Sequence, residues 1–379
     1  MNQRLLIARL IFPTIFLTVY IYISQQLFRY AQIEKIELIF YHLLTAIPIL
    51  AMASMPYFFW TRKDIEQIKK NEKVIPFVYF ILSYFSSLLM LILIRDICHF
   101  LFSFLNQNYF RYDLQEAQFI LIFPLFLHLL GYVTYLSGPY LKTVTLNHPH
   151  TPDELKGTRI VHLSDIHIGP QMKANGLRKI IKKVNSLNAD FVVLTGDIID
   201  AHPEFHQETI QLLDCFQCNQ ETLYIPGNHE YYHQFELVEK ELNKLKLITL
   251  LNETKIYEIN NRRIGFSGAT DPTAKMFNLP GPQIERLSEE AMNADFRVLL
   301  IHQPNSGVQI KKSNFHIQLS GHTHAGQFIP WSLMIKLFQK YAKGLYKEEL
   351  HWIYVNQGTG FWGPRNRFGT YCEITLIKL

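Results

Sequence analysis

Charged residues and cysteine are both scarce in this sequence of 379 residues. Asp, Glu, Lys and Arg make up 18% and hydrophobic residues 48%. Disordered chains have the opposite balance, so intrinsic disorder is excluded. Glycine (18) and proline (17) are too few for collagen or low-complexity material. The cysteines are too few for a disulfide framework, so a reducing compartment is allowed; they are Cys98, Cys215, Cys218 and Cys372. What remains is a folded chain of two or three domains.

Four N-terminal runs contain no Asp, Glu, Lys or Arg. They cover residues 10–28, 38–61, 74–94 and 117–141 and are 19 to 25 residues long. About 20 apolar residues are enough for a helix to cross the hydrocarbon layer of a bilayer. The pattern therefore predicts four transmembrane helices. We divide the chain into a transmembrane region, 1–145, and a second domain, 150–379.

Cations are concentrated in the connection after the second apolar run, where Arg62, Lys63, Lys69, Lys70 and Lys73 lie. Connections rich in Lys and Arg stay in the cytoplasm. With an even number of spans, the second domain is on that same side. We therefore expect a multi-pass protein of the cell (inner) membrane whose C-terminal domain is cytoplasmic.

Short apolar runs alternate with amphipathic segments from about Thr158 onward. The apolar runs predict strands at 159–163, 191–194, 223–225, 264–266, 298–301, 315–319, 352–355 and 374–377. The amphipathic segments predict helices at 173–187, 208–216 and 231–245. Such alternation is typical of an α/β domain. Ligands of these domains bind beyond the carboxyl ends of the strands.

Asp, Asn and His residues gather just past these strands. The clusters are Asp165-Ile-His167, Gly-Asp197-Ile-Ile-Asp200, Gly-Asn228-His229-Glu, His302 and Gly-His322-Thr-His324. In extended chain, residues two positions apart point to the same side, so we expect Asp165 and His167 to converge on one ion. Imidazole with carboxylate suits Mn, Fe or Zn, and the lack of thiolates argues against a structural zinc site.

These clusters offer too many potential ligands for one ion. They fit two ions that share a carboxylate, an arrangement that phosphoesterases use with the ions about 3.5–4 Å apart. Water between two such cations has a lowered pKa, which makes hydroxide available near neutral pH. The pattern therefore predicts hydrolysis of a phosphoric ester.

In their order along the chain, the five motifs resemble the signature of the calcineurin-like metallophosphoesterases. The ending Gly-His-Thr-His-Ala-Gly-Gln is most similar to a bacterial subgroup whose members are membrane-associated or exported. The resemblance covers roughly 158–379. It implies a four-layer α/β/β/α sandwich with two divalent metal ions, manganese before iron or zinc.

The resemblance also implies a role for each motif residue. The first metal takes Asp165, His167, Asp197 and His324. The second takes Asp197 as a bridge, with Asn228, His302 and His322. His229 then stands near the leaving-group oxygen, and Asp200 orients it.

Together these observations predict a membrane-bound phosphoesterase that cleaves a phosphoester or pyrophosphate bond. Its expected partners are the lipid bilayer and a substrate that is a phosphorylated small molecule or lipid. Similarity to one relative makes a UDP-diacylglucosamine lipid a candidate substrate, and a soluble nucleotide or phosphodiester stays open. Alternatives are a non-catalytic membrane sensor or scaffold and a transporter with an appended domain. No basic stripe with interleaved aromatics indicates nucleic acid, and the oligomeric state stays open.

Several other features have more than one interpretation. Arg365 and Arg367 either contact substrate phosphate through a guanidinium fork or belong to an ordinary turn. The apolar segment 328–338, beside Lys336, Lys340 and Lys343, either packs, admits an acyl chain or rests on lipid. His233 is interpreted as a surface or packing residue. His42 and His128, inside predicted spans, are interpreted as neutral side chains bonded to neighbouring helices.

Overall fold

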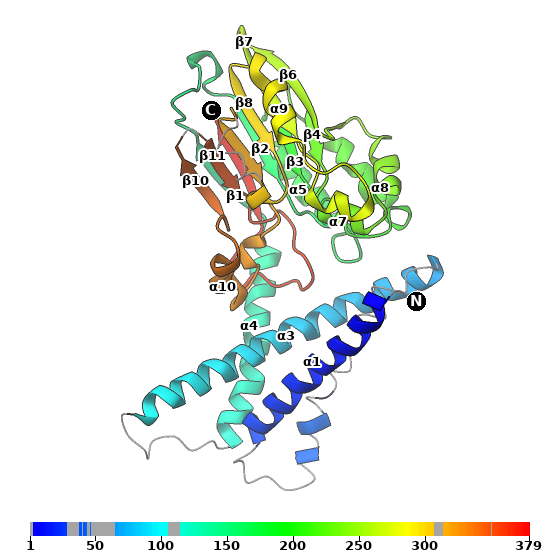
Figure 1. Ribbon diagram of the computed structural model, residues 1–379, viewed down its shortest axis with the longest axis vertical. Helices are drawn as coiled ribbons and strands as arrows, with labels where there is room; N and C mark the ends of the chain where they lie inside the picture. Colours follow the sequence, from blue (N-terminus) through cyan, green and yellow to red (C-terminus); the bar gives the residue numbers. More distant parts are fainter. Residues whose placement is uncertain are drawn as a thin grey trace. The chain divides into compact units, whose positions relative to one another are not determined.

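The computed structural model of the chain describes residues 3–28, 38–39, 41–43, 46, 65–104, 114–306, 314–349 and 351–379 (Figure 1). The chain divides into two compact units. One comprises Met1–Tyr132 with Gly363–Arg365, and the other Val133–Trp362 with Asn366–Leu379.

The first unit contains helices α1 (Gln3–Phe28), α3 (Ile65–Ser103) and most of α4 (Leu114–Ser137). Among the described residues, two stretches are long and apolar enough to cross a membrane, Glu72–Ser103 and Leu114–Ser137. The predicted runs 10–28 and 74–94 are helical, within α1 and α3. Most of the predicted helix 38–61, with Arg62 and Lys63, lies outside the described residues.

Helix α3 begins nine residues before the predicted span at 74. Lys69, Lys70 and Lys73, which the prediction placed in a loop, therefore lie in its first turns. Lys70 forms an ion pair with Glu66, four residues earlier, at 3.2 Å. Ion pairs at this sequence separation stabilise a helix, here in the part of α3 before the apolar stretch. His128 lies 2.5 Å from Ser83 of α3, which agrees with the interpretation of a hydrogen-bonded histidine.

The predicted helix 117–141 ends early, because α4 stops at Ser137. Gly138 and Pro139 follow, and proline both lacks an N–H and disfavours helical conformation in the residue before it. The chain continues as strand β1 (Tyr140–Thr145), which pairs in parallel with β12 (Glu373–Lys378). Residues 140–145, assigned from the sequence to the membrane region, thus form the edge of a sheet.

Two six-stranded mixed sheets form the second unit. The first has the order β1, β12, β2 (Arg159–Leu163), β3 (Phe191–Thr195), β4 (Thr222–Ile225) and β5 (Ile248–Thr249). The second has the order β10 (Gly344–Glu348), β11 (His351–Val355), β9 (Ile317–Ser320), β8 (Phe296–Leu300), β7 (Arg262–Gly268) and β6 (Glu253–Ile259). All eight predicted strands are present, in β2, β3, β4, β7, β8, β9, β11 and β12.

The sheets pack face to face, and helices cover their outer faces (Figure 1). Phe191 of β3 meets Phe266 of β7 between the sheets, with ring centroids 4.7 Å apart. Helices α5 (Ala174–Asn185) and α8 (Phe235–Leu242) share a buried cluster with the other face of the first sheet. Helix α9 (Ile284–Glu290) packs Leu287 against Leu299 of the second sheet. The predicted α/β/β/α layering is therefore present.

Candidate metal centre

The predicted site residues all follow central strands of the two sheets. β2, β3 and β4 are mutually parallel, as are β8 and β9. Their carboxyl ends therefore meet at one edge of each sheet, and the loops that leave them carry the five motifs. Strand pairing brings together side chains that are up to 159 positions apart in the sequence.

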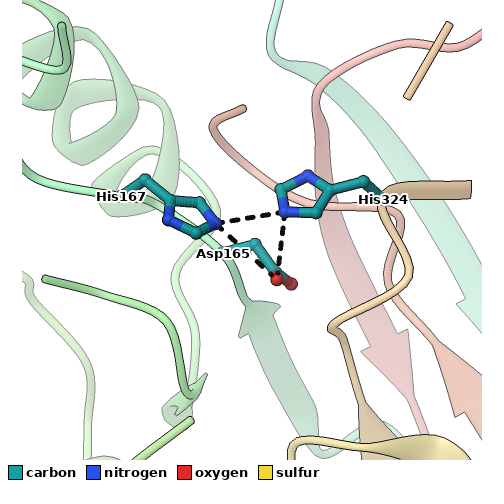
Figure 2. Close-up of side chains that lie close together, drawn as sticks. All are labelled: Asp165, His167 and His324. Atoms are coloured by element: carbon teal, nitrogen blue, oxygen red, sulfur yellow. Dashed lines mark hydrogen bonds and ion pairs between the residues drawn. The ribbon is translucent and has the colours of Figure 1, made fainter. Parts of the chain in front are cut away.

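Asp165, His167 and His324 form the first cluster (Figure 2). The Nε2 atoms of His167 and His324 lie 3.1 Å apart. Asp165 Oδ1 is 3.3 Å from His324 Nε2 and 4.0 Å from His167 Nε2. All three side chains are buried, so three donor atoms converge on one point away from bulk water.

Asp197, His302 and His322 form the second cluster. His302 Nε2 lies 3.1 Å from Asp197 Oδ2, and His322 Nδ1 lies 2.9 Å from Asn228 Oδ1. Asp197 also groups with His167 and His229. Its carboxylate therefore lies between the two clusters, the place that a ligand shared by two ions must occupy.

The chemistry of these donors fits divalent cations. His302 Nδ1 lies 2.7 Å from the carbonyl oxygen of Thr195, to which it donates, so Nε2 faces Asp197. That Nε2 atom is buried, and its one close polar neighbour among the described residues is the Asp197 carboxylate, so a cation placed between the two would take both as ligands. Burial, and then the charge of His302, lower the pKa of His322 to about 3 and keep its ring neutral.

The electrostatics of the second cluster favour a cation as well. Burial would raise the pKa of Asp197, but the charges of His302 and His229 outweigh it and hold that pKa well below its usual range. Burial would lower the pKa of His302, but Asp197 and then Asp165 reverse the effect. A buried carboxylate that attracts a proton to its neighbour this strongly attracts a bound cation for the same reason.

Five of the seven predicted ligands have left-handed backbone conformations, with φ between 49° and 71°; they are Asp165, His167, Asp197, His322 and His324. The expectation that Asp165 and His167 converge is met, but its reason was wrong, because neither residue is extended. Such conformations cost about 1–3 kcal/mol each and cluster at functional sites. The loops are therefore held in these shapes by the structure around them.

Glycines allow the loops to approach the ligands closely. A side chain at Gly227 would overlap the Asp197 carboxylate, and one at Gly321 would overlap Ser164 Oγ and the Asp165 carboxylate. Each of these glycines directly precedes a predicted ligand, Asn228 or His322. These two glycines are therefore required for space, since neither has a positive φ.

Gly321→Ala is expected to reduce metal content below two ions per chain, because the added methyl group displaces Asp165. Metal content after purification in Mn²⁺ measures the effect. Gly344→Ala is the matched control: at φ +81° it adds backbone strain, but it has nothing within 4 Å to strike. Equal metal loss in both variants would show that the loss does not depend on the contact between residue 321 and Asp165.

His229 lies at the start of the short helix α7 (Asn228–Tyr232), and its Nδ1 is 2.6 Å from Asp200 Oδ1. Burial would lower the pKa of His229, but the carboxylates of Asp200 and Asp197 raise it to about 9. These two carboxylates therefore favour the protonated form of His229. Its Nε2, on the far side of the ring from Asp200, lies 3.9 Å from Asp197 Oδ2.

Asp200 contacts more than one imidazole. Its Oδ2 lies 3.4 Å from Nδ1 of the predicted ligand His167, and its Oδ1 lies 3.0 Å from His233 Nε2. His233, interpreted from the sequence as a surface or packing residue, therefore belongs to this network. Asp200 therefore orients the predicted ligand His167 as well as His229.

Glu230 is a buried residue of the Gly-Asn-His-Glu motif whose role the sequence did not indicate. Its carboxylate accepts four backbone hydrogen bonds, from Gly227 N (2.8 Å), Asp197 N (3.0 Å), Ile198 N (2.6 Å) and Ile199 N (2.9 Å). Burial and the Asp197 charge raise the pKa of Glu230 to about 7. This side chain ties the loop that carries Asp197 to the helix that carries His229.

Glu230→Gln is expected to destabilise the site while conserving volume, because one oxygen acceptor becomes an NH₂ donor facing backbone N–H groups. Hydrogen bonds to a charged group contribute about 1.5–3 kcal/mol each, so the loss should reach at least that size. Thermal unfolding with and without Mn²⁺ measures it. An unchanged melting temperature in both conditions would contradict the assigned role.

Arg367 is fully buried, and both of its terminal nitrogens are hydrogen-bonded within the protein. One terminal nitrogen donates to the carbonyls of His324 (3.2 Å) and Gln357 (2.9 Å), and the other lies 3.2 Å from His324 Nδ1. The expected contact with substrate phosphate is therefore wrong for Arg367, which instead positions His324. Arg365 is half-buried, and its substrate role stays a prediction.

A family model described as calcineurin-like phosphoesterase matches residues 158–326. An uncharacterized metallophosphoesterase of Campylobacter jejuni is 36% identical over 248 residues, 64% of this chain and 64% of the relative. A Danio rerio transmembrane protein with metallophosphoesterase domain is 32% identical over 280 residues, 70% of this chain and 63% of the relative. Uncharacterized metallophosphoesterase YkuE of Bacillus subtilis is 29% identical over 259 residues, 66% of this chain and 89% of YkuE.

The matched residues include all five motifs. The alignments with the C. jejuni and D. rerio proteins cover less than two thirds of those proteins' own length, 64% and 63%.

Proposed function

The domain that begins at Thr158 belongs to the calcineurin-like phosphoesterase family, and from this premise we propose that the chain is a metal-dependent phosphoesterase. It hydrolyses a phosphoester or pyrophosphate bond with two divalent cations. The observation that carries this proposal is the position of Asp197, whose carboxylate is shared by the cluster with His302 and the cluster with His167 and His229.

In this proposal Asp165, His167, Asp197 and His324 hold one cation, and Asp197, Asn228, His302 and His322 hold the other. Manganese is our first candidate, with iron and zinc as alternatives, because imidazole, carboxylate and amide donors suit all three. Two bound cations supply a nucleophilic water at neutral pH and neutralise charge on the phosphoryl oxygens. Metal analysis of protein purified without chelator tests the assignment.

The chain's own residues contribute proton transfer and orientation. His229, in its protonated form, donates a proton from Nε2 to the departing oxygen. Asp200 accepts the hydrogen bond from Nδ1 at 2.6 Å and fixes the ring. Asp197 holds the start of the same helix, because its Oδ1 accepts from His229 N at 2.9 Å. A general acid beside the metal ligands is needed for catalysis but not for binding. Its presence favours an enzyme over a non-catalytic sensor or scaffold.

We further propose that the substrate's leaving group is apolar. Three exposed aromatic side chains lie near His229. Tyr232 and Trp362 have ring centroids 5.5 and 5.9 Å from the His229 ring, and Phe277 lies 6.3 Å from Tyr232. A lipid-linked phosphoester presents such a group, and UDP-diacylglucosamine is one compound of this class to test beside a soluble nucleotide.

Membrane attachment is also a proposal, supported by the apolar stretches in α3 and α4 and by the name of the D. rerio relative, a transmembrane protein. We propose a multi-pass protein of the inner membrane with a cytoplasmic catalytic domain. Cys215, which is exposed in that domain, gives a test. A membrane-impermeant maleimide should label Cys215 only after cell lysis. If intact cells were labelled, and this labelling were lost in Cys215→Ser, the domain would lie outside the cytoplasm.

The catalytic proposal is tested by hydrolysis of bis-p-nitrophenyl phosphate and p-nitrophenyl phosphate by the full chain in detergent. Activity should disappear after chelation and return with Mn²⁺. The ratio of the two rates separates a diesterase from a monoesterase. Protein that binds two Mn²⁺ per chain and hydrolyses neither ester nor a pyrophosphate would overturn the proposal in favour of a binding protein.

A further inference from the structure

Helix α10 (Trp331–Phe338) presents an apolar surface that the second unit does not bury. Six of its eight residues are apolar, and none is buried. The exposed fractions are 69% for Leu333, 77% for Leu337 and 70% for Phe338. Of the interpretations given to segment 328–338, packing holds for Phe328, which is 6% exposed, whereas no residue of α10 is buried.

This helix is firmly attached to the catalytic domain. Ser332 N donates to the carbonyl of Phe328 at 2.9 Å, and Ile329 N donates to that of Phe368 at 2.9 Å. Phe328 is 6% exposed, so the segment leading into α10 is anchored in the domain. The exposed surface is therefore presented in a fixed position.

The location of α10 indicates what covers it. Helix α10 lies at the same end of the second unit as the start of β1, where α4 enters (Figure 1). Only Gly138 and Pro139 separate α4, a candidate membrane span, from β1. If α4 crosses a bilayer, the chain passes from the lipid into the domain at this end.

The composition of α10 and its flank fits the interfacial layer of a bilayer. Lys336 and Lys343 are exposed, and the helix contains no acidic residue. Tryptophan at one end, leucine and phenylalanine on the surface and lysine beside them are typical of helices that lie in the plane of a membrane interface. Lysine additionally favours anionic headgroups.

We propose that α10 inserts its exposed apolar side chains into the interfacial layer of the membrane that α3 and α4 are proposed to cross. The inference rests on the membrane attachment proposed above. Trp331 follows the predicted ligand His324 by seven residues. Inserted α10 would therefore hold the metal centre close to the lipid surface, where a lipid-linked phosphoester is found.

The test is tryptophan quenching of the full chain in nanodiscs of phosphatidylcholine and phosphatidylglycerol, with and without brominated acyl chains. Bromine quenches only tryptophans in contact with lipid. Trp331→Phe should lower the quenched fraction, whereas the control Trp352→Phe, which removes a ring only 6% exposed, should not. Equal quenching in wild type and Trp331→Phe would overturn the proposal.

A second pair of variants makes the test independent of the Trp331 side chain. In the Trp331→Phe background, Leu337→Trp should restore quenching, while Met292→Trp should not. Met292 is 54% exposed but belongs to the turn before β8, at the opposite end of that strand from His302. No restoration by Leu337→Trp means that α10 packs on protein and overturns the inference. Failure of the chain to resist carbonate extraction would instead refute the underlying membrane attachment.

Discussion

Asp197→Asn is expected to reduce phosphoesterase activity to background and to lower the metal content below two ions per chain. The substitution keeps the size of the side chain but removes its negative charge. A neutral amide lacks the charge that lets one carboxylate bridge two divalent cations. Hydrolysis of bis-p-nitrophenyl phosphate and metal analysis of the same preparation measure both effects.

Asp271→Asn is the matched control for this prediction. Asp271 is also a fully buried carboxylate, and burial raises its pKa. It lies outside the metal-ligand clusters, and its Oδ1 caps a turn by accepting from Thr273 N at 2.8 Å. The control should keep two ions per chain. If Asp197→Asn kept both ions and full turnover, Asp197 would not be the shared ligand.

Central strands were predictable from the sequence, whereas the strands at the sheet edges were not. The four strands missed are β1, β5, β6 and β10, and they are the four edges of the two sheets. A central strand is buried on both faces and reads as a continuous apolar run. The edge strand β6 has no buried position and includes Glu253, Lys255 and Glu258. These charged residues interrupt its apolar residues, so it does not form a continuous apolar run.

The site was predictable in its members but not in its geometry. The sequence indicates which residues follow strands, and parallel pairing brings those strand ends together. The left-handed conformation of Asp165 and Asp197 depends on loops fixed by distant groups, such as the hydrogen bonds that Glu230 accepts. No spacing rule within a motif contains that information.

Arg367 and His233 show a further limit of the sequence. An arginine in a Gly- and Pro-containing stretch looks available for an anion, and only the fold shows that it is buried behind His324. His233 stands four residues after His229, and its bond to Asp200 depends on where the β3 loop passes. The chemical type of these side chains was evident, but their partners come from remote segments.

His229→Ala is expected to lower kcat by about 10²–10⁴, the usual contribution of a positioned general acid, while both cations stay bound. His229 is absent from the proposed ligand sets, and its side chain is held by Asp200 at 2.6 Å. The loss should depend on the leaving group. Hydrolysis of a p-nitrophenyl ester should slow least, because p-nitrophenolate departs without a proton. Hydrolysis of an alkyl ester should slow most, because the departing alkoxide needs the proton.

The pH dependence separates this role from a structural one. The acid must be protonated, so the wild-type rate should fall as pH rises through the pKa of His229. Asp200 and Asp197 raise that pKa to about 9, and two bound cations lower it again by repulsion. The fall should therefore lie at or below about pH 9, and it should be absent in His229→Ala. His233→Ala leaves the bond between His229 and Asp200 in place, so it should keep the pH-dependent fall. Metal loss in His229→Ala that equals its loss of turnover would contradict the acid role, because the ring would then be holding the cations in place.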